Sequence, residues 1–346
     1  MFNSIANRYR LLSYTMLAAL FAATSTAHAS VHIIPNFLSS ITTSPDAVQI
    51  EDVIDSTIGV FRNLYDNNLT ITVNFGFTPG APGDLLSTNQ DYYDVPYTTY
   101  VNALKADSVA HPGNIVLSTA IANLSKGNDA NGANDMALSG AQVAMLGLGP
   151  ASDSDATVTI NSNQSFSFSR AVSNSRYDLI GGLEHELNEV LGGGGGGSTL
   201  NSIASSCATR RSGFFCNKLG SLDLYRYSAP GLPSFSTSSS ASAYFSVNGG
   251  QTKIVAFNQN SSGDFGDFAP AGTGAGQLIQ NAFNSTGQDE VYTNLSPEYM
   301  MMESIGYDGT VPEPSTWAMT LMGFAGLGFV GYRSARRRLL AWSAMI

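Results

Sequence analysis

His185, Glu186 and Glu189 are the residues of this sequence best suited to chemistry, because they form the pattern His-Glu-x-x-Glu. Residues four apart lie on one face of a helix, so a helix here would place His185 and Glu189 beside the same metal ion. Glu186 lies one position further round, where its carboxylate would act as general base on a metal-activated water. Zinc accepts both imidazole nitrogen and carboxylate oxygen, which makes one zinc ion the expected cofactor. The five residues alone would equally fit a solvated helix whose acidic face includes a histidine.

The flanking sequence predicts the helix that this pattern requires. Between Tyr177 and Leu191, apolar residues recur at steps of three and four and form a stripe that would anchor the helix in a core. The stripe consists of Leu179, Leu183, Leu187, Val190 and Leu191. The polar face would then line a cleft. A catalytic zinc site takes three protein ligands and leaves one position for water, so one ligand must come from outside this helix.

Three blocks of sequence, in order along the chain, carry a family resemblance: Arg176 to Gly192, Leu222 to Gly231 and Ser304 to Asp308. They resemble the active-site helix, the Leu-Asp-Leu-Phe-Arg-Tyr-Ser-Ala-Pro-Gly block and the closing Ile-Gly-Tyr-Asp of a bacterial family of predicted zincin-like metalloproteases. In that family His-Glu-x-x-Glu occurs beside the commoner His-Glu-x-x-His. The resemblance implies an α+β zincin-like fold, in which a mixed twisted sheet and helices back the active-site helix and a loop-rich C-terminal lobe follows.

The chain departs from the better-known metzincin pattern, His-Glu-x-x-His-x-x-Gly-x-x-His or Asp, at two positions. Gly192 fits the pattern, but Glu189 replaces the second histidine and Gly195 replaces the third ligand. A negatively charged ligand in place of imidazole should leave the zinc a weaker Lewis acid. Slow turnover, or another metal, would be consistent with such a site.

The third ligand is expected to be a carboxylate, since the other histidines are poorly placed. His28 would leave with a signal peptide, His32 would lie at the mature N-terminus, and His111 falls in a predicted loop. Asp223, in the second of the resembling blocks, is the first candidate. The further candidates are Asp264, Asp267 and Glu303. Because most acidic residues are structural or solvated, Asp223 could instead be a turn or ion-pair partner of Arg226.

Residues 1–29 predict a secretory signal peptide. Two arginines precede an apolar run, Leu11 to Ala23, and the small-x-small sequence Ala27-His28-Ala29 would allow signal peptidase to cut before Ser30. An uncut anchor is the alternative, but the apolar run is short against the roughly 20 residues of a spanning helix.

Residues 311–346 form a tripartite tail. Pro312, Glu313 and Pro314 are followed by an apolar segment, 316–332, predicted as a transmembrane helix, and then by four arginines. The tail resembles the PEP-CTERM sorting signal of Gram-negative bacteria, which an exosortase is thought to recognise and remove. The arginines would stay cytoplasmic, leaving everything before Pro312 outside the inner membrane. We therefore expect an inner-membrane intermediate and then release to the cell surface or extracellular matrix, although a plain anchor would have the same orientation.

Charge excludes some classes of partner. The 346 residues carry 26 acidic and 16 basic side chains, a net charge of −10. Without the two terminal segments, 25 acidic and 10 basic residues remain, a net charge of −15. So acidic a protein is unsuited to nucleic acid or to anionic lipid, and contact with a membrane is expected only through the tail before processing.

Cys207 and Cys216 are the only cysteines of the sequence. In an oxidising periplasm or at the cell surface they would form one disulfide that closes the loop 208–215. A metal role is the alternative, but the spacing is not that of a Cys-x-x-Cys zinc motif.

Periodicity predicts the main elements of the region 30–310, which we expect to divide into lobes of 30–192 and 193–310. Helices are predicted from Pro45 to Tyr65, over 97–106, 139–146 and 177–191, and from Ser296 to Gly306; strands are predicted over 69–77 and 156–160, and a hairpin over 243–257. The six glycines at 192–197 would end the active-site helix and then form a mobile turn. The Met300-Met301-Met302 run resembles the methionine turn of metzincins, but core packing is the favoured explanation.

The sequence therefore favours a secreted or cell-surface zinc-dependent endopeptidase with a protein or peptide substrate. The alternative is a surface or exopolysaccharide-matrix protein that keeps a peptidase fold without full metal coordination. The missing third histidine and the glycine run would suit that alternative.

Overall fold

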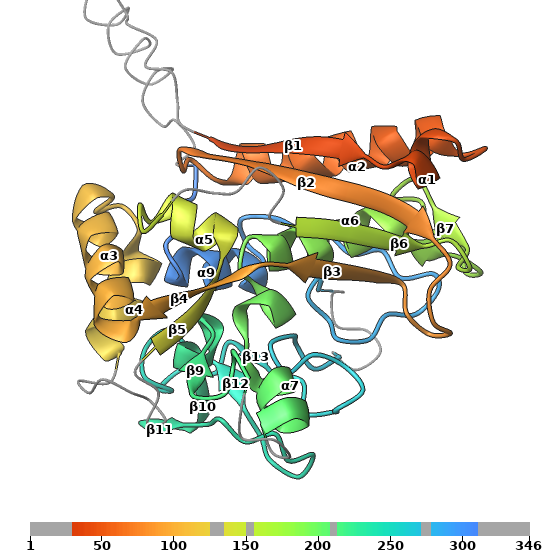
Figure 1. Cartoon of the computed structure of the whole chain (residues 1–346). Coiled ribbons are helices and arrows are strands. Elements are labelled where there is room, and N and C mark those ends of the chain that lie inside the picture. The colour runs from red at the N-terminus through yellow and green to blue at the C-terminus, as the bar shows by residue number, and fades with distance from the viewer. Residues whose placement is uncertain (1–29, 125–134, 150–155, 208–212, 271–277, 311–346) are drawn as a thin grey trace, which may run out of the picture.

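The computed structural model describes residues 30–124, 135–149, 156–207, 213–270 and 278–310. Both predicted sorting segments, the signal peptide at 1–29 and the tail with its apolar segment 316–332, lie outside the described residues. In Figure 1 the first strands of the chain lie at the top, helices α6 (Leu179–Val190) and α9 (Pro297–Ser304) lie in the middle, and the short strands that follow α6 in the chain lie at the bottom. Mixed helices and sheets confirm the α+β class.

The largest sheet has four strands in the order β1-β2-β6-β3. Its strands are β1 (Val31–Phe37), β2 (Leu69–Thr78), β6 (Ala156–Asn161) and β3 (Leu86–Gln90). β1, β2 and β6 are parallel, with Val31 opposite Leu69 and Val73 opposite Ala156, whereas β3 is antiparallel to β6 and forms the edge. In β2 the buried residues alternate with more exposed ones, as the period of two predicts.

Smaller sheets complete the strand inventory of the described residues. β4 (Tyr92–Pro96), β5 (Asp135–Ser139) and β9 (Lys218–Leu219) form one sheet; β11 (Leu232–Pro233), β10 (Arg226–Ala229), β12 (Tyr244–Phe245) and β13 (Val255–Ala256) form another; β7 (Phe166–Ser167) pairs with β8 (Tyr177–Asp178). The antiparallel pair β12 and β13 confirms the predicted hairpin. Gly249 and Gly250, both at positive φ, allow its turn.

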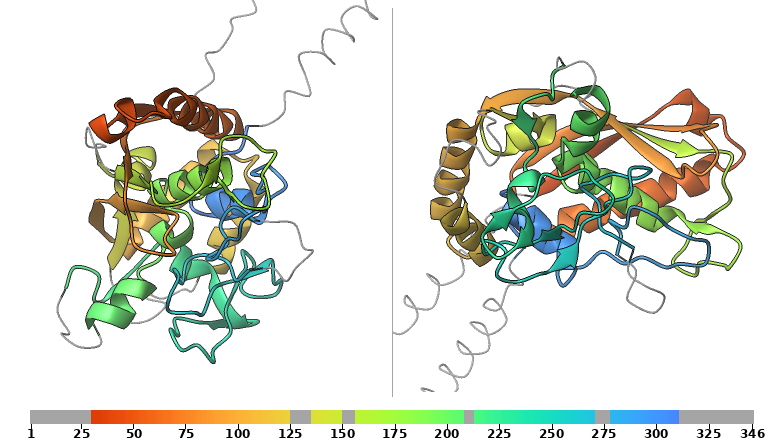
Figure 2. Two further views of the ribbon diagram at one scale, coloured as in Figure 1. Left: turned by 90° about the vertical axis from the view of Figure 1, so that its right-hand side faces the viewer. Right: turned by 90° about the horizontal axis from the view of Figure 1, so that it is seen from below.

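The helices agree with the periodic segments of the sequence and add three more, α1 (Ser39–Thr42), α4 (Ile115–Asn123) and α7 (Leu200–Ser202). The others are α2 (Ala47–Leu64), α3 (Tyr97–Ala110), α5 (Gly140–Met145), α6 (Leu179–Val190) and α9 (Pro297–Ser304). α2 buries the predicted face, including Ile54 and Phe61 at 0% exposure. α2 packs along α6, as the right-hand view of Figure 2 also shows, and α6 packs against β3. Met301 and Met302 are fully buried core residues.

Strand β1 was not predicted, because Pro35 and two polar residues interrupt its apolar alternation. The strand lies at the other edge of the sheet, where a proline that lacks an N–H donor is tolerated. Parallel pairing with β2 buries Val31 and Ile33. A tertiary contact therefore decides the structure of this segment more than its local pattern does.

Candidate metal centre

Helix α6 supplies three of the residues at the candidate site. Asp178 caps its N-terminus, because its Oδ1 accepts a hydrogen bond of 3.0 Å from the backbone N–H of Ile180. The predicted apolar stripe is confirmed, with Leu179, Leu183 and Leu187 at 0% exposure. The stripe fixes the rotation of the helix, so that His185, Glu186 and Glu189 all line one cavity of about 400 Å³.

The imidazole of His185 is oriented by its own backbone contact. Its Nδ1 lies 2.8 Å from the carbonyl oxygen of Ile279, and a carbonyl can only accept. Nδ1 therefore carries a proton, and in the neutral ring Nε2 presents a lone pair to the cavity. This is the tautomer in which histidine binds a metal, with the other ring nitrogen bonded to a carbonyl.

Two carboxylate oxygens lie close to this nitrogen. His185 Nε2 lies 3.5 Å from Glu189 Oε1 and 3.6 Å from Asp267 Oδ2, and the three atoms all lie within 4.8 Å of one another. Two ligands of a tetrahedral zinc ion at about 2.1 Å would lie about 3.4 Å apart. Glu189 Oε1 is buried and has no hydrogen-bond partner, which is the condition of an atom that a cation would satisfy. The donor set thus fits a zinc-class divalent ion.

Asp267 reaches the site from a loop far along the chain. Its Oδ1 accepts hydrogen bonds from the N–H of Gly195, at 2.8 Å, and from Gln280 Nε2, at 2.9 Å. These two bonds leave Oδ2 directed at His185. The Gln280 amide is fixed in turn by Asn188 of α6, whose Nδ2 donates to Gln280 Oε1 at 2.8 Å.

Asp223, expected as the third ligand, is not in this cluster. Its Oδ1 accepts from the Ser198 hydroxyl at 2.7 Å, and its Oδ2 accepts from the N–H groups of Thr199, at 3.0 Å, and Gly220, at 2.9 Å. These donors already satisfy the carboxylate, so Asp223 stabilises a buried turn, and Asp267 is the carboxylate that lies beside His185 and Glu189. Of the other candidates, Asp264 lines the cavity and Glu303 lines a different one.

No spacing rule singles out Asp267 in the sequence. The one local signal is Gly266, directly before it, because a glycine can mark a close approach between two backbone segments. A Cβ on Gly266 would lie 2.2 Å from the carbonyl oxygen of Gly194. The glycine run and the Asp267 loop therefore need small residues on both sides of their contact.

The glycine run is packed, and the expected mobile turn is wrong. Gly192 ends the helix at φ +91, as predicted, but Gly194–Gly197 form a 3₁₀ turn against the site, with all but Gly195 buried. A Cβ on Gly195 would lie 2.5 Å from Glu189 Oε1, and a Cβ on Gly194 would lie 2.0 Å from Gln280 Nε2. The absence of side chains is what lets this turn approach two residues of the centre.

Glu186 lies beside His185, Glu189 and Asp267 and is oriented by strand β3. The Thr88 hydroxyl donates to its Oε2 at 2.7 Å. Burial, and then repulsion from Glu189, raises the pKa of Glu186 to about 8. Burial likewise raises the pKa of Asp267 to about 7, against the attraction of His185.

His185 responds to the same charges in the opposite way. Burial alone would lower its pKa, but the Asp267 and Glu189 carboxylates reverse the effect and raise the pKa well above its ordinary value. The site therefore favours positive charge at its centre, whether that charge is a proton or a metal ion.

The far side of α6 carries a second group of buried acidic residues. Glu184 is fully buried and pairs with Arg170, whose other nitrogen donates to the carbonyl oxygen of Glu290. Burial raises the pKa of Glu184 to about 7 and that of Glu290 to about 8. Buried carboxyls therefore surround the helix on both sides.

The disulfide is confirmed. Cys207 and Cys216 are bonded, with Cα atoms 5.4 Å apart. Among the described residues, no helix has the length and apolar content needed to cross a membrane.

Residues 310–338 match the PEP-CTERM protein-sorting motif, which includes Pro312, Glu313 and Pro314. Neither the comparison with curated proteins nor the comparison with solved structures gave a match. The sorting motif indicates export, processing by an exosortase-type enzyme, and association with the surface or surroundings of a Gram-negative cell.

Proposed function

We propose that this protein is an exported, zinc-dependent endopeptidase with a zincin-like fold. The observation that carries the proposal is the convergence of His185 Nε2, Glu189 Oε1 and Asp267 Oδ2 beside Glu186 in one cavity. His185, Glu189 and Asp267 would hold one zinc ion. When bound, the ion would act as a Lewis acid on a scissile carbonyl and on water.

Glu186 would be the general base. Its Oε2 accepts from Thr88, so Oε1 is the atom left to take a proton and to return it to the leaving amine. A pKa of about 8 would leave Glu186 mostly protonated at neutral pH. A cation beside Glu189 would favour the carboxylate of Glu186 and restore its basicity.

Strand β3 supports a peptide as the substrate. It forms an edge of the sheet, and the same strand lines the cavity through Leu86, Ser87 and Thr88. An extended peptide can add to such an edge through main-chain hydrogen bonds. That placement would bring a peptide bond to the face of α6 that carries Glu186.

A second candidate function is that of a non-catalytic surface or matrix protein with this fold. Gln280 favours it, because its Nε2 lies 3.2 Å from His185 Nε2 and also donates to Asp267. The amide thus contacts the same histidine nitrogen, and the same aspartate, that a metal ion would bind. Two carboxylate ligands would also make any bound zinc a weak Lewis acid.

Metal content and hydrolysis separate the two functions. The exported protein should contain zinc and should cleave unfolded proteins in a broad panel. A chelator should stop the cleavage, and added Zn²⁺ should restore it. If the protein binds no divalent metal and cleaves nothing in the panel, the endopeptidase proposal fails and the non-catalytic function replaces it.

A further inference from the structure

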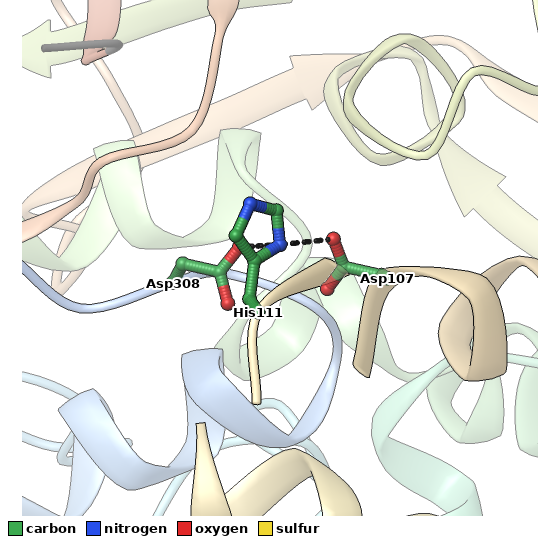
Figure 3. Close-up of side chains that lie close together, drawn as sticks. All are labelled: Asp107, His111 and Asp308. Atoms are coloured by element: carbon green, nitrogen blue, oxygen red, sulfur yellow. Dashed lines mark hydrogen bonds and ion pairs between the residues drawn. The ribbon is translucent and has the colours of Figure 1, made fainter. Parts of the chain in front are cut away.

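A second group of metal-ligating atoms lies at the C-terminal end of α3, remote from the His185 centre. Asp107 and His111 are one helical turn apart, and Asp308 comes from the segment that follows α9. Figure 3 shows the three side chains directed at one another. His111 Nδ1 lies 2.9 Å from Asp107 Oδ1 and 2.7 Å from Asp308 Oδ2. All three ligand atoms lie within 4.8 Å of one another.

Hydrogen bonding satisfies this cluster poorly. Nδ1 carries at most one proton, yet two carboxylate oxygens lie within 3 Å of it, so one N–H can serve both only by weakening each bond. Asp107 Oδ2 is also buried and has no hydrogen-bond partner. A divalent cation would bind the nitrogen lone pair and both carboxylates at once, once the exposed His111 ring moves back from its present 2.7 and 2.9 Å to the roughly 3.4 Å that separates two ligands of one zinc ion.

The carboxylate of Asp308 is fixed in place before any ion binds. Its Oδ1 accepts from Asn114 Nδ2 at 3.2 Å. Its backbone N–H donates to Asn67 Oδ1 at 2.8 Å, and its carbonyl oxygen accepts from the N–H of Asp66 at 2.8 Å. Ligands oriented in this way lose little freedom when a metal binds.

The surroundings are open to solvent and negatively charged. His111 and Asp308 line a cavity of about 360 Å³ together with Asp66 and Glu303, and its described lining contains no lysine or arginine. The His111 side chain is 49% exposed, whereas that of Asp308 is 9% exposed. An ion could therefore enter from solvent and be bound against a buried carboxylate.

We propose that Asp107, His111 and Asp308 form a second metal site, which takes a divalent transition-metal ion of the zinc class. The imidazole nitrogen favours this class over calcium or magnesium, which prefer oxygen ligands alone. The site is independent of the proposed peptidase function, since it shares no residue with the His185 centre.

The position of this site in the chain suggests what the ion would do. Asp308 lies two residues before residue 310, where the match to the sorting motif begins. An ion bound to all three residues would fasten the last described segment to α3, directly before the tail that is processed. The bound ion would therefore stabilise the folded protein at the point where the sorting signal joins it.

Zinc titration of the exported protein tests the proposal, with protein purified without a histidine tag and stripped of metal. The His185→Ala variant removes the first centre, and isothermal titration calorimetry should still show one Zn²⁺ per chain. The His185→Ala, His111→Ala double variant should bind none. His185→Ala, His32→Ala is the matched control, because His32 is exposed on β1, and it should keep one ion. Zn²⁺ should also raise the melting temperature of the control and not that of the double variant.

Asp308→Asn in the His185→Ala background is the second variant, since it keeps the size of the side chain and weakens a ligand. Its Zn²⁺ affinity should fall at least about tenfold. No Zn²⁺ binding by His185→Ala, or binding that survives the loss of His111, would overturn the proposal. Binding that Ca²⁺ displaces and that survives in His111→Ala would overturn it in favour of a calcium site. If the His185 centre does not bind zinc and the second site does, wild type and His185→Ala should each bind one ion.

Discussion

His185 Nδ1 lies 2.8 Å from the carbonyl oxygen of Ile279, 94 residues further along the chain. This contact fixes the ring of a helix residue to a segment of the second half of the protein. It also decides which nitrogen faces the cavity, because the carbonyl requires a proton on Nδ1. Any metal binding by the helix would therefore depend on a loop that the His-Glu-x-x-Glu pattern does not contain.

His185→Ala and Glu186→Gln should differ in their effects. The first removes one of three proposed ligands, so stoichiometric zinc at this centre should be lost together with hydrolysis. The second leaves the ligands and removes the base, so zinc should remain and the hydrolytic rate should fall at least about 100-fold. Metal analysis and a protein-cleavage assay on both variants check this. Equal loss of zinc in the two would show that Glu186 is a ligand.

Asp267→Asn and Asp223→Asn should also differ. An amide coordinates more weakly than a carboxylate, so Asp267→Asn should lower zinc affinity with little effect on folding. Asp223→Asn should leave the affinity unchanged and lower stability by about 1–3 kcal/mol, because an amide has one acceptor oxygen, so either the Ser198 hydroxyl or the N–H groups of Thr199 and Gly220 would lose their acceptor. Zinc titration and urea unfolding of each variant provide the test. A greater loss of affinity in Asp223→Asn would restore Asp223 as the ligand.

Local periodicity predicted the elements that carry their own pattern. The apolar stripe of α6 and the alternation of β2 each bury one face, so sequence and structure agree there. Asp267 could not be selected in the same way, because its position beside His185 arises from loop contacts with Gly195 and Gln280 that have no local signature. It was one of several acidic candidates until tertiary structure brought its Oδ2 to His185.

His111 is a second residue whose surroundings could not be predicted from the sequence. In the sequence it lies before a proline in a predicted loop, which made it a poor ligand candidate. The structure places it as the C-terminal cap of α3, one turn after Asp107, and brings Asp308 to it from nearly 200 residues away. Only the first of these relationships, the spacing of four, can be read from the sequence.

Gly195→Ala should disturb the metal centre through its added methyl group. That Cβ would lie 2.5 Å from Glu189 Oε1 and 2.8 Å from the side chain of Asp264, so a proposed ligand must move. Zinc affinity should fall while the fold is kept. Gly59→Ala is the matched control, since nothing lies within 4 Å of its Cβ position on α2, and it should leave affinity unchanged. Unchanged zinc affinity in Gly195→Ala would show that the turn does not position the ligand.

Stability of the metal-free protein should fall as the pH rises. Burial raises the pKa of Glu290 from 4.5 to about 8, so between these values the folded state binds more protons than the unfolded state. The stabilisation by the protonated carboxyl is fully present below about pH 4.5 and is lost as the pH passes 8, an effect on the order of a few kcal/mol. Glu184 acts in the same direction, since its pKa is raised to about 7.

Glu290→Gln should make this pH dependence shallower, because an amide keeps the shape of the side chain and cannot ionise. Urea unfolding at pH 5.5 and 8.5, with chelator present, measures the change in the free energy of unfolding for both proteins. Asp55→Asn is the control for the loss of one carboxylate, since Asp55 is exposed on α2. A wild-type protein that gains stability between pH 5.5 and 8.5, or a Glu290→Gln variant with the wild-type slope, would contradict the assignment of this carboxyl as neutral in the folded state.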